Sequence, residues 1–213
     1  DTLDPSGQND IFAGINTDFH EVVWFYPDTT SFSNLINKYV IYNYADQVWS
    51  VGTMDRTTWF DRGVYANPYA TQYLPNSTTN VTPTITGDLS NGVSAVFSQE
   101  NGYNGNGSAI SASITSGDFD ISDEQAGVVM AVRKFIPDFK DQSGNVNVIM
   151  QFRNYPQGSA SSASSNSLVE TTTTHIDLRG RGRTANVKFS SDTTDTNWRF
   201  GTLRLDLQPD GMR

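Results

Sequence analysis

The chain has 213 residues, of which 23 are acidic and 14 basic, so its formal net charge is −9 at pH 7. It has no cysteine and only 2 histidines, which excludes thiol catalysis, thiolate metal sites and disulfide cross-links and leaves little scope for histidine-rich metal sites. The acidic balance disfavours general binding to nucleic-acid backbone or to an anionic membrane surface, and no apolar run approaches the roughly 20 residues of a membrane-spanning helix.

The residue types favour an all-β fold. Aromatic residues make up 12% of the chain and charged residues 17%, a balance that argues against disorder. Lysine and glutamate, which stabilise exposed helices, are the minority among the charged residues, whereas threonine, valine and the aromatic residues suit half-buried strands. We therefore expect antiparallel sheets, with a first region over residues 1–116 and a second over residues 117–213.

The first region contains four short apolar segments in close succession. Residues 22–26 form a continuous apolar run that predicts a strand covered on both faces, and residues 39–44 and 47–51 predict a hairpin. Residues 57–60 predict a fourth strand. Four short strands in meander order are typical of a β-propeller blade, although the same order also occurs in sandwiches. The first region is therefore predicted to be propeller-blade-like.

The second region shows a clearer alternation of apolar and polar residues. Apolar residues recur at every second position of 146–152, 185–189 and 203–207, which predicts half-buried antiparallel strands. The Ser- and Ala-rich segment 158–167 predicts a surface loop or hairpin tip, and the Pro-, Asn- and Thr-rich segment 67–80 of the first region predicts a loop or linker. We expect the second region to be an antiparallel β unit, either a sandwich or further blades. Other strands are predicted at 81–86, 93–98 and 109–115.

The densest acidic cluster contains Asp118, Asp120, Asp123 and Glu124. A pair of carboxylates on a β scaffold could catalyse glycoside hydrolysis, and a group of them could bind calcium. A solvated turn explains the cluster as well, because Asp118 and Asp120 lie on the same face of a predicted strand end. The sequence contains no Gly-x-Ser-x-Gly motif, no His-Glu-x-x-His motif and no phosphate-binding glycine loop. We therefore predict a protein that is not an enzyme and has no cofactor.

Arginine and glycine alternate in the one patterned basic segment of the chain. If this segment is extended, Arg179, Arg181 and Arg183 share one face at intervals of about 7 Å, and Gly180 and Gly182 leave the other face bare. Such a row suits phosphates or the carboxylates of a neighbouring subunit, and in an acidic chain we favour carboxylates, for example those of the cluster formed by Asp118, Asp120, Asp123 and Glu124. Close approach of another segment to the backbone is a further explanation for the two glycines.

A series of motifs is distributed over the whole chain. They lie at residues 20–27 (HEVVWFYP), 39–53 (YVIYNYADQVWSVGT), 56–63 (RTTWFDRG), 116–123 (SGDFDISD), 136–139 (IPDF), 153–156 (RNYP), 178–183 (LRGRGR) and 198–211 (WRFGTLRLDLQPDG). In this order, which is more specific than any one motif, they resemble the C-terminal part of phage tail structural proteins of the nozzle class. That class includes the tail tubular protein B and the packaged-DNA stabilisation proteins of short-tailed phages.

The resemblance implies a β-propeller-bearing virion protein that assembles as a ring and extends the tail tube below the portal and adaptor. Such a protein, assembled in the host cytoplasm, retains packaged genomic DNA and lets it pass during ejection without sequence specificity. Its implied partners are copies of itself and other tail proteins, namely the adaptor and a tail fibre or spike. The family is structural, so no catalytic residue carries over. Because its members are usually much longer, we expect Asp1 to begin partway through a protein.

An alternative function is that of a phage-associated carbohydrate-binding or depolymerising β-module. The four tryptophans would then serve as platforms for sugar rings. Each of them lies within an apolar strand pattern, so we expect core packing instead, and in particular a buried Trp49. The tryptophans in question are Trp24, Trp49, Trp59 and Trp198.

Overall fold

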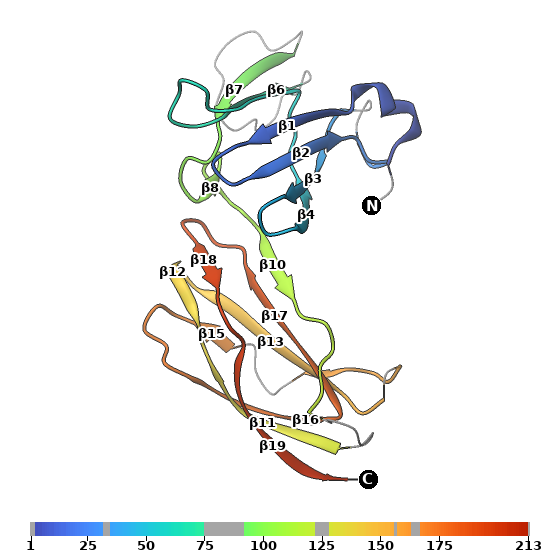
Figure 1. Ribbon diagram of the computed structural model, residues 1–213, viewed down its shortest axis with the longest axis vertical. Helices are drawn as coiled ribbons and strands as arrows, with labels where there is room; N and C mark the ends of the chain where they lie inside the picture. The colour runs from blue at the N-terminus through green and yellow to red at the C-terminus, as the bar shows by residue number, and fades with distance from the viewer. Residues whose placement is uncertain are drawn as a thin grey trace. The chain divides into compact units, whose positions relative to one another are not determined.

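The computed structural model describes residues 3–31, 35–74, 92–121, 128–155, 157–162 and 167–212. Nearly all of its regular structure is antiparallel β-strand, which confirms the predicted all-β fold (Figure 1). Within these ranges the one helix is a short 3-10 helix, Pro5–Asp10, which is capped by the side chain of Asp4.

The chain folds as two compact units, Asp1–Asn101 (unit 1) and Gly102–Arg213 (unit 2). The division predicted from the sequence lies after Ser116 and assigns the strand β10 (Ala112–Thr115) to the first region. This strand instead pairs with β17 (Thr184–Ser191), with Ile114 opposite Phe189. Backbone hydrogen bonding to β17 therefore places β10 in unit 2.

Unit 1 contains a four-stranded antiparallel meander. Its strands follow the order β1-β2-β3-β4, at Phe12–Asn16, Glu21–Tyr26, Lys38–Asn43 and Val48–Thr53. The strand and the hairpin predicted within 22–51 are confirmed, but the fourth member of the sheet is β1. The described residues form no closed propeller, so the blade stays a prediction.

A second sheet of unit 1 has the order β5-β6-β7, at Thr58–Phe60, Tyr69–Leu74 and Val93–Ser98. The predicted loop over 67–80 is thus wrong for 69–74, because β6 is the central strand of this sheet and its Ala70 is buried. Pairing on both sides outweighs the weak strand signal of a segment with Pro- and Asn-rich flanks. The strand predicted at 81–86 lies outside the described residues.

The core of unit 1 lies between one face of the meander and β5. Val23 and Phe25 of β2 are buried, and the rings of Phe25 and Trp59 lie 5.7 Å apart, centroid to centroid. The indole N–H of Trp59 donates to the carbonyl of Ile15 at 2.8 Å. Trp59 therefore joins the two sheets through both an apolar contact and a hydrogen bond, as a core tryptophan with a satisfied N–H does.

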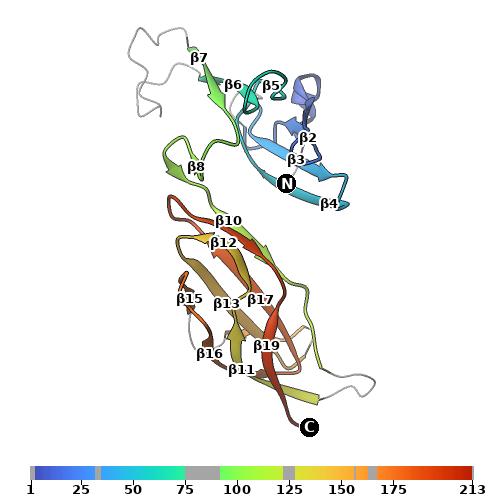
Figure 2. The ribbon, with the colours of Figure 1, turned by 60° about the vertical axis from the view of Figure 1, so that its left-hand side comes forward.

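Unit 2 is a two-layer sandwich (Figure 1, Figure 2). One layer has the order β10-β17-β13-β14, with β15 also paired to β13, and the other has the order β16-β11-β19. Valine, methionine and phenylalanine side chains from both layers form a single core. The remaining strands of unit 2 are β8 (Asn104–Gly105), β9 (Ser108–Ala109), β11 (Val128–Ile136), β12 (Phe139–Ser143), β13 (Val146–Arg153), β14 (Ser161–Ser162), β15 (Ser167–Val169), β16 (Ile176–Gly182), β18 (Asn197–Phe200) and β19 (Arg204–Met212).

The alternating stripes predicted for the second region are confirmed. Val146, Val148, Met150 and Phe152 of β13 are each exposed by 1% or less, and the residues between them are half-buried. The stripe of β17 at 185–189 is buried in the same way, and the leucines of 203–207 pack at the edge of this core. Part of the loop predicted at 158–167 is paired, because Ser161 and Ser162 lie opposite Phe152 and Gln151 of β13.

The two glycines of the Arg-Gly segment lie against Phe152 of the opposite layer of unit 2. A Cβ atom placed on Gly180 would lie 1.9 Å from Cε2 of Phe152, and one on Gly182 would lie 2.9 Å from Cβ of the same residue. Such distances leave no room for a methyl group next to a buried ring. Close packing against Phe152 therefore explains both glycines.

We predict that Gly180→Ala lowers the free energy of unfolding by about 1–3 kcal/mol, because the added methyl group has to displace a buried phenylalanine ring. Urea denaturation measures this change. Gly117→Ala is the matched control, since nothing lies within 4 Å of the Cβ it would add. Equal effects of the two substitutions would contradict the packing explanation.

Candidate functional site

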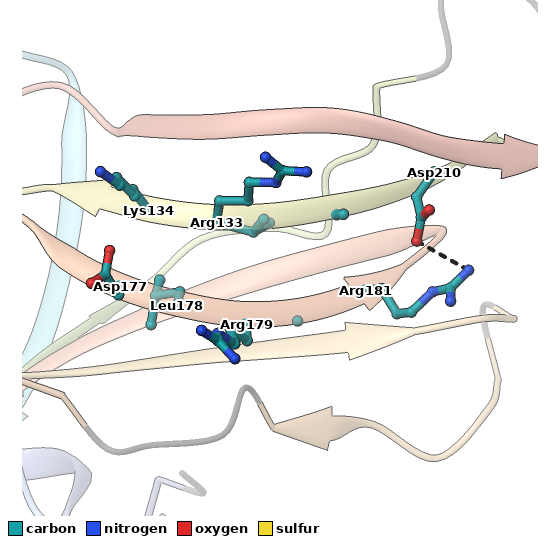
Figure 3. A pocket seen from close by; sticks show the side chains of 10 residues that line it. Arg133, Lys134, Asp177, Leu178, Arg179, Arg181 and Asp210 are labelled. Carbon is teal, nitrogen blue, oxygen red and sulfur yellow. Dashed lines mark ion pairs between the residues drawn. The ribbon is translucent and has the colours of Figure 1, made fainter.

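A basic groove runs over the outer face of β16 and β11 in unit 2 (Figure 3). Successive side chains of β16 point to opposite faces of the sheet. Leu178 and the two glycines therefore face the core, and the residues between them, Asp177, Arg179 and Arg181, face outward. Across the groove, an irregularity between Val132 and Lys134 interrupts the alternation of β11, so that Arg133 and Lys134 are both exposed. The groove has a volume of about 630 Å³.

The charges of the groove are unequally paired. Arg181 forms an ion pair with Asp210 of β19 at 3.1 Å, and both side chains are largely exposed to solvent. An exposed ion pair of this kind contributes roughly 0–1 kcal/mol to the free energy of unfolding. Arg133, Lys134 and Arg179 have no ion-pair partner among the described residues. The groove therefore presents more positive than negative charge, although the chain as a whole is acidic.

Arg183 does not extend the row formed by Arg179 and Arg181. The strand β16 ends at Gly182, where the chain turns into β17, and the guanidinium of Arg183 lies over the ring of Tyr155 at 5.4 Å. Its backbone N–H donates to the carbonyl of Arg153 at 2.9 Å. The predicted spacing thus applies to two of the three arginines, because the extended conformation that it assumes stops one residue before Arg183.

The acidic cluster predicted from the sequence is only partly described. Asp118 accepts hydrogen bonds from the guanidinium of Arg153 at 2.8 and 2.9 Å, and from the amide of Asn186 at 2.8 Å. This carboxylate is therefore bound within its own chain and stabilises unit 2. Asp120 is exposed, while Asp123 and Glu124 lie outside the described residues.

The outer face of the meander in unit 1 is open and aromatic. Trp24, Tyr42 and Trp49 point away from the core, since they alternate with the core-facing residues of β2, β3 and β4. The ring of Trp49 stacks on Trp24 with centroids 5.9 Å apart and packs on Tyr42 at 4.6 Å. Trp49 is 63% exposed, and the neighbouring Val51 is 68% exposed.

The expectation of a buried Trp49 is wrong, and so is that of a strand covered on both faces at 22–26. An unbroken apolar run places side chains on both faces of a sheet, but the core of unit 1 covers only the face of Val23 and Phe25. Trp59 and Trp198 do pack against the cores of their units, as expected. No local pattern identifies the open face, because which face is covered depends on how the second sheet packs against the meander.

The described residues contain neither a cluster of metal-binding side chains nor a membrane-spanning helix. Among the described residues, no three acidic or histidine side chains come together where they could hold a metal ion. No helix in the described ranges is long and apolar enough to cross a membrane. The chain matches no model of a known protein family, and no curated protein matches it. The motifs and the geometry of the two exposed surfaces are therefore the features that point to a function.

We predict that Trp49→Ala changes the free energy of unfolding by only about 1 kcal/mol or less, because the side chain is mostly exposed and loses chiefly its aromatic neighbours. Phe25→Ala, in the same sheet but fully buried, should cost about 3–5 kcal/mol through the cavity that it leaves. Chemical denaturation of both variants provides the comparison. A loss at Trp49 as large as that at Phe25 would mean that the open face is covered in the folded protein.

Proposed function

We propose that the chain is a structural subunit of a phage tail, similar to proteins of the nozzle class, and that it is not an enzyme. The observation that carries this proposal is the ordered series of motifs, which extends over both units. The motif at 20–27 contains β2, the motif at 39–53 contains the β3–β4 hairpin, and the motif at 178–183 contains most of β16. The motifs therefore include strands that contribute to the cores and strands that carry the two exposed surfaces.

The surface chemistry supports a subunit with neighbours. A contiguous exposed aromatic face is typical of interaction sites, since isolated soluble proteins rarely expose one. In a ring, each copy offers the same pair of surfaces to the next. An acidic wall along the channel would also let DNA slide without binding tightly, because phosphates and carboxylates repel. In this proposal the protein belongs to the virion and contacts copies of itself, an adaptor and a fibre or spike.

Within the proposed ring, the basic groove receives carboxylates of the neighbouring subunit. Arg133, Lys134 and Arg179 supply positive charge without an ion-pair partner in the described part of their own chain. Asp118 is a weak choice as the neighbour's acceptor because it already binds Arg153 and Asn186. The predicted acceptors Asp123 and Glu124 lie outside the described residues.

We predict that Arg179→Ala combined with Arg181→Ala leaves the subunit folded but weakens assembly by up to about tenfold for each interface. Raised salt should weaken assembly of the unchanged protein in the same direction, because exposed charges are screened. Light scattering and negative-stain imaging measure the assembly. The control variant combines Lys140→Ala with Arg199→Ala, two residues that lie opposite each other on β12 and β18, outside the groove. It loses the same amount of positive charge and should assemble normally.

The same double variant separates two roles of the groove. Normal tails with altered retention or ejection of the genome would mean that the arginines contact the phosphates of passing DNA. Normal tails with normal retention and ejection would rule out both roles. The segment would then serve only the packing of Gly180 and Gly182 against Phe152.

The open aromatic face favours a second candidate function, the binding of a saccharide. The rings of Trp24, Tyr42 and Trp49 form one aromatic surface. The plane of the Trp49 ring makes an angle of 27° with that of Trp24 and of 34° with that of Tyr42. Such a platform can stack against the apolar face of a sugar ring. This function does not require a ring assembly, so a monomer that binds a glycan would favour it.

For this second candidate we predict that Trp49→Ala abolishes saccharide binding while leaving the unfolding transition almost unchanged. Purified bacterial surface polysaccharides are titrated against the chain, and tryptophan fluorescence reports binding. Trp198→Phe, at a half-buried site in unit 2, is the control that should leave binding intact. If no polysaccharide changes the fluorescence of the unaltered chain, the candidate is eliminated.

A further inference from the structure

The two edges of the meander in unit 1 differ. β4 is the last strand of the order β1-β2-β3-β4 and, among the described residues, it pairs with β3 alone (Figure 2). The opposite edge is covered, because the indole N–H of Trp59 in β5 donates to the carbonyl of Ile15 in β1 at 2.8 Å. The sheet thus has one covered edge and one open edge.

The hydrogen bond that follows β4 shows which of its backbone groups point outward. The N–H of Met54, directly after β4, donates to the carbonyl of Asn37 at 3.2 Å and continues the register of β4 with β3. In an antiparallel pair every second residue exchanges its N–H and C=O with the neighbouring strand, and the residues between direct theirs away from it. Trp49, Val51 and Thr53 therefore direct their N–H and C=O groups to the open edge.

β4 lacks the features that normally protect an edge strand. Natural sheets prevent edge-to-edge pairing with charged residues, prolines, bulges or very short strands. Residues 47–54 contain no charged residue and no proline, and the register with β3 is unbroken over the six residues of β4. By contrast, the edge strand β19 of unit 2 contains Pro209 and has two irregularities in its register with β11. The open edge of β4 is therefore suited to the addition of another strand.

The side chains of β4 add apolar surface to these backbone groups. Val48, Trp49 and Val51 are exposed by 56%, 63% and 68%. Trp49 and Val51 lie on the outer face of the meander, and Val48 lies on the other face. Large apolar side chains that are exposed side by side are typical of an interaction site. A strand added along β4 would cover their flanks on both faces of the sheet.

We propose that β4 pairs antiparallel with β4 of a second copy of the chain, around a twofold axis through Ser50. Outward-directed residues have to lie opposite each other, so Trp49 of each copy lies opposite Val51 of the other and exchanges backbone hydrogen bonds with it. An aromatic and a β-branched side chain form a favourable cross-strand pair, and the twofold axis provides this pair twice. The two meanders then form one continuous sheet.

The distribution of charge favours a second copy over a charged partner. Each copy has a formal net charge of −9, so two copies repel where their carboxylates meet. In the proposed register Asp46 lies opposite Met54 and Asp55 lies opposite Ala45, so no two of these carboxylates face each other. A charged peptide, in contrast, would find no opposite charge along residues 47–54. This interface goes beyond the proposed tail function and does not depend on it.

Single cysteines test the register, because the chain has no cysteine of its own. Ser50→Cys places two thiols opposite each other at a position where Cα atoms lie about 4.5 Å apart, which a disulfide can span. Oxidation should convert this variant to a covalent dimer on non-reducing electrophoresis. Val51→Cys, at the next exposed position, is the matched control and should cross-link at least about tenfold more slowly, since its thiols are offset by two residues. Equal cross-linking, or faster cross-linking of Val51→Cys, would overturn the proposal.

Sedimentation of the full chain over a range of protein concentrations tests the association itself. The unaltered chain should shift from monomer to dimer as its concentration rises. Val51→Pro removes an outward N–H that β3 does not use, and the dimer loses one such hydrogen bond for each copy. This variant should associate about tenfold more weakly or less, whereas its unfolding temperature should change little.

Ser50→Asp keeps every backbone group and places two carboxylates opposite each other, so it should also prevent association. Ser113→Asp, at an exposed position of the edge strand β10, adds the same charge and should associate as the unaltered chain does. A chain that stays monomeric at every concentration would overturn the proposal, and so would normal association of Ser50→Asp.

Salt and the groove variant separate this interface from the one proposed for the basic groove. Backbone pairing involves no net charge, so raised salt should leave the β4 dimer intact, although it weakens contacts between exposed charges. The chain with Arg179→Ala and Arg181→Ala should still form the dimer, since β4 belongs to unit 1 and the groove to unit 2. Loss of the dimer in that variant would mean that the groove, and not β4, joins the two copies.

Discussion

The contact between Phe152 and the backbone of Gly180 and Gly182 sets the distance between the two layers of unit 2. A buried ring can fill that space only because neither glycine has a side chain. Alternation along β16 then forces Arg179 and Arg181 to the outer face, since they occupy the positions between the glycines. The basic groove is therefore a consequence of how the core is packed, and the arginines cannot change faces without placing charge against Phe152.

The charge of this protein is distributed unevenly, and the local distribution matters more than the total. The chain is acidic overall, yet the outer face of β11 and β16 gathers Arg133, Lys134 and Arg179, which form no ion pair with any residue that the structure describes. In unit 1 burial raises the pKa of Glu21, and the negative charge of Glu100 raises it further. Salt screens exposed charges beyond about 10 Å, so the potential at the basic groove depends on its own side chains more than on the net charge of the chain.

Alternation of apolar residues identified the strands of unit 2 well. The stripe from Val146 to Phe152 and the stripe at 185–189 are buried as their period of two requires. The same reasoning missed β6, since polar and proline-rich neighbours hide its short pattern, and it misassigned the fourth strand of the meander. It also misjudged Trp49, because an apolar pattern shows that a residue suits a core and does not show which face of the sheet another layer covers.

The sequence by itself determined the all-β class, the inward and outward faces of the long strands, and the association of arginine with glycine at residues 179–182. Each of these follows from local geometry, because side chains in a strand alternate whatever the strand pairs with. Only the tertiary structure decided that β5 pairs with β6, that the face of Trp49 is open, and that Asn16 donates to Glu100. These depend on contacts between residues far apart in the chain, and such contacts arise from the packing of whole sheets, which no local pattern encodes.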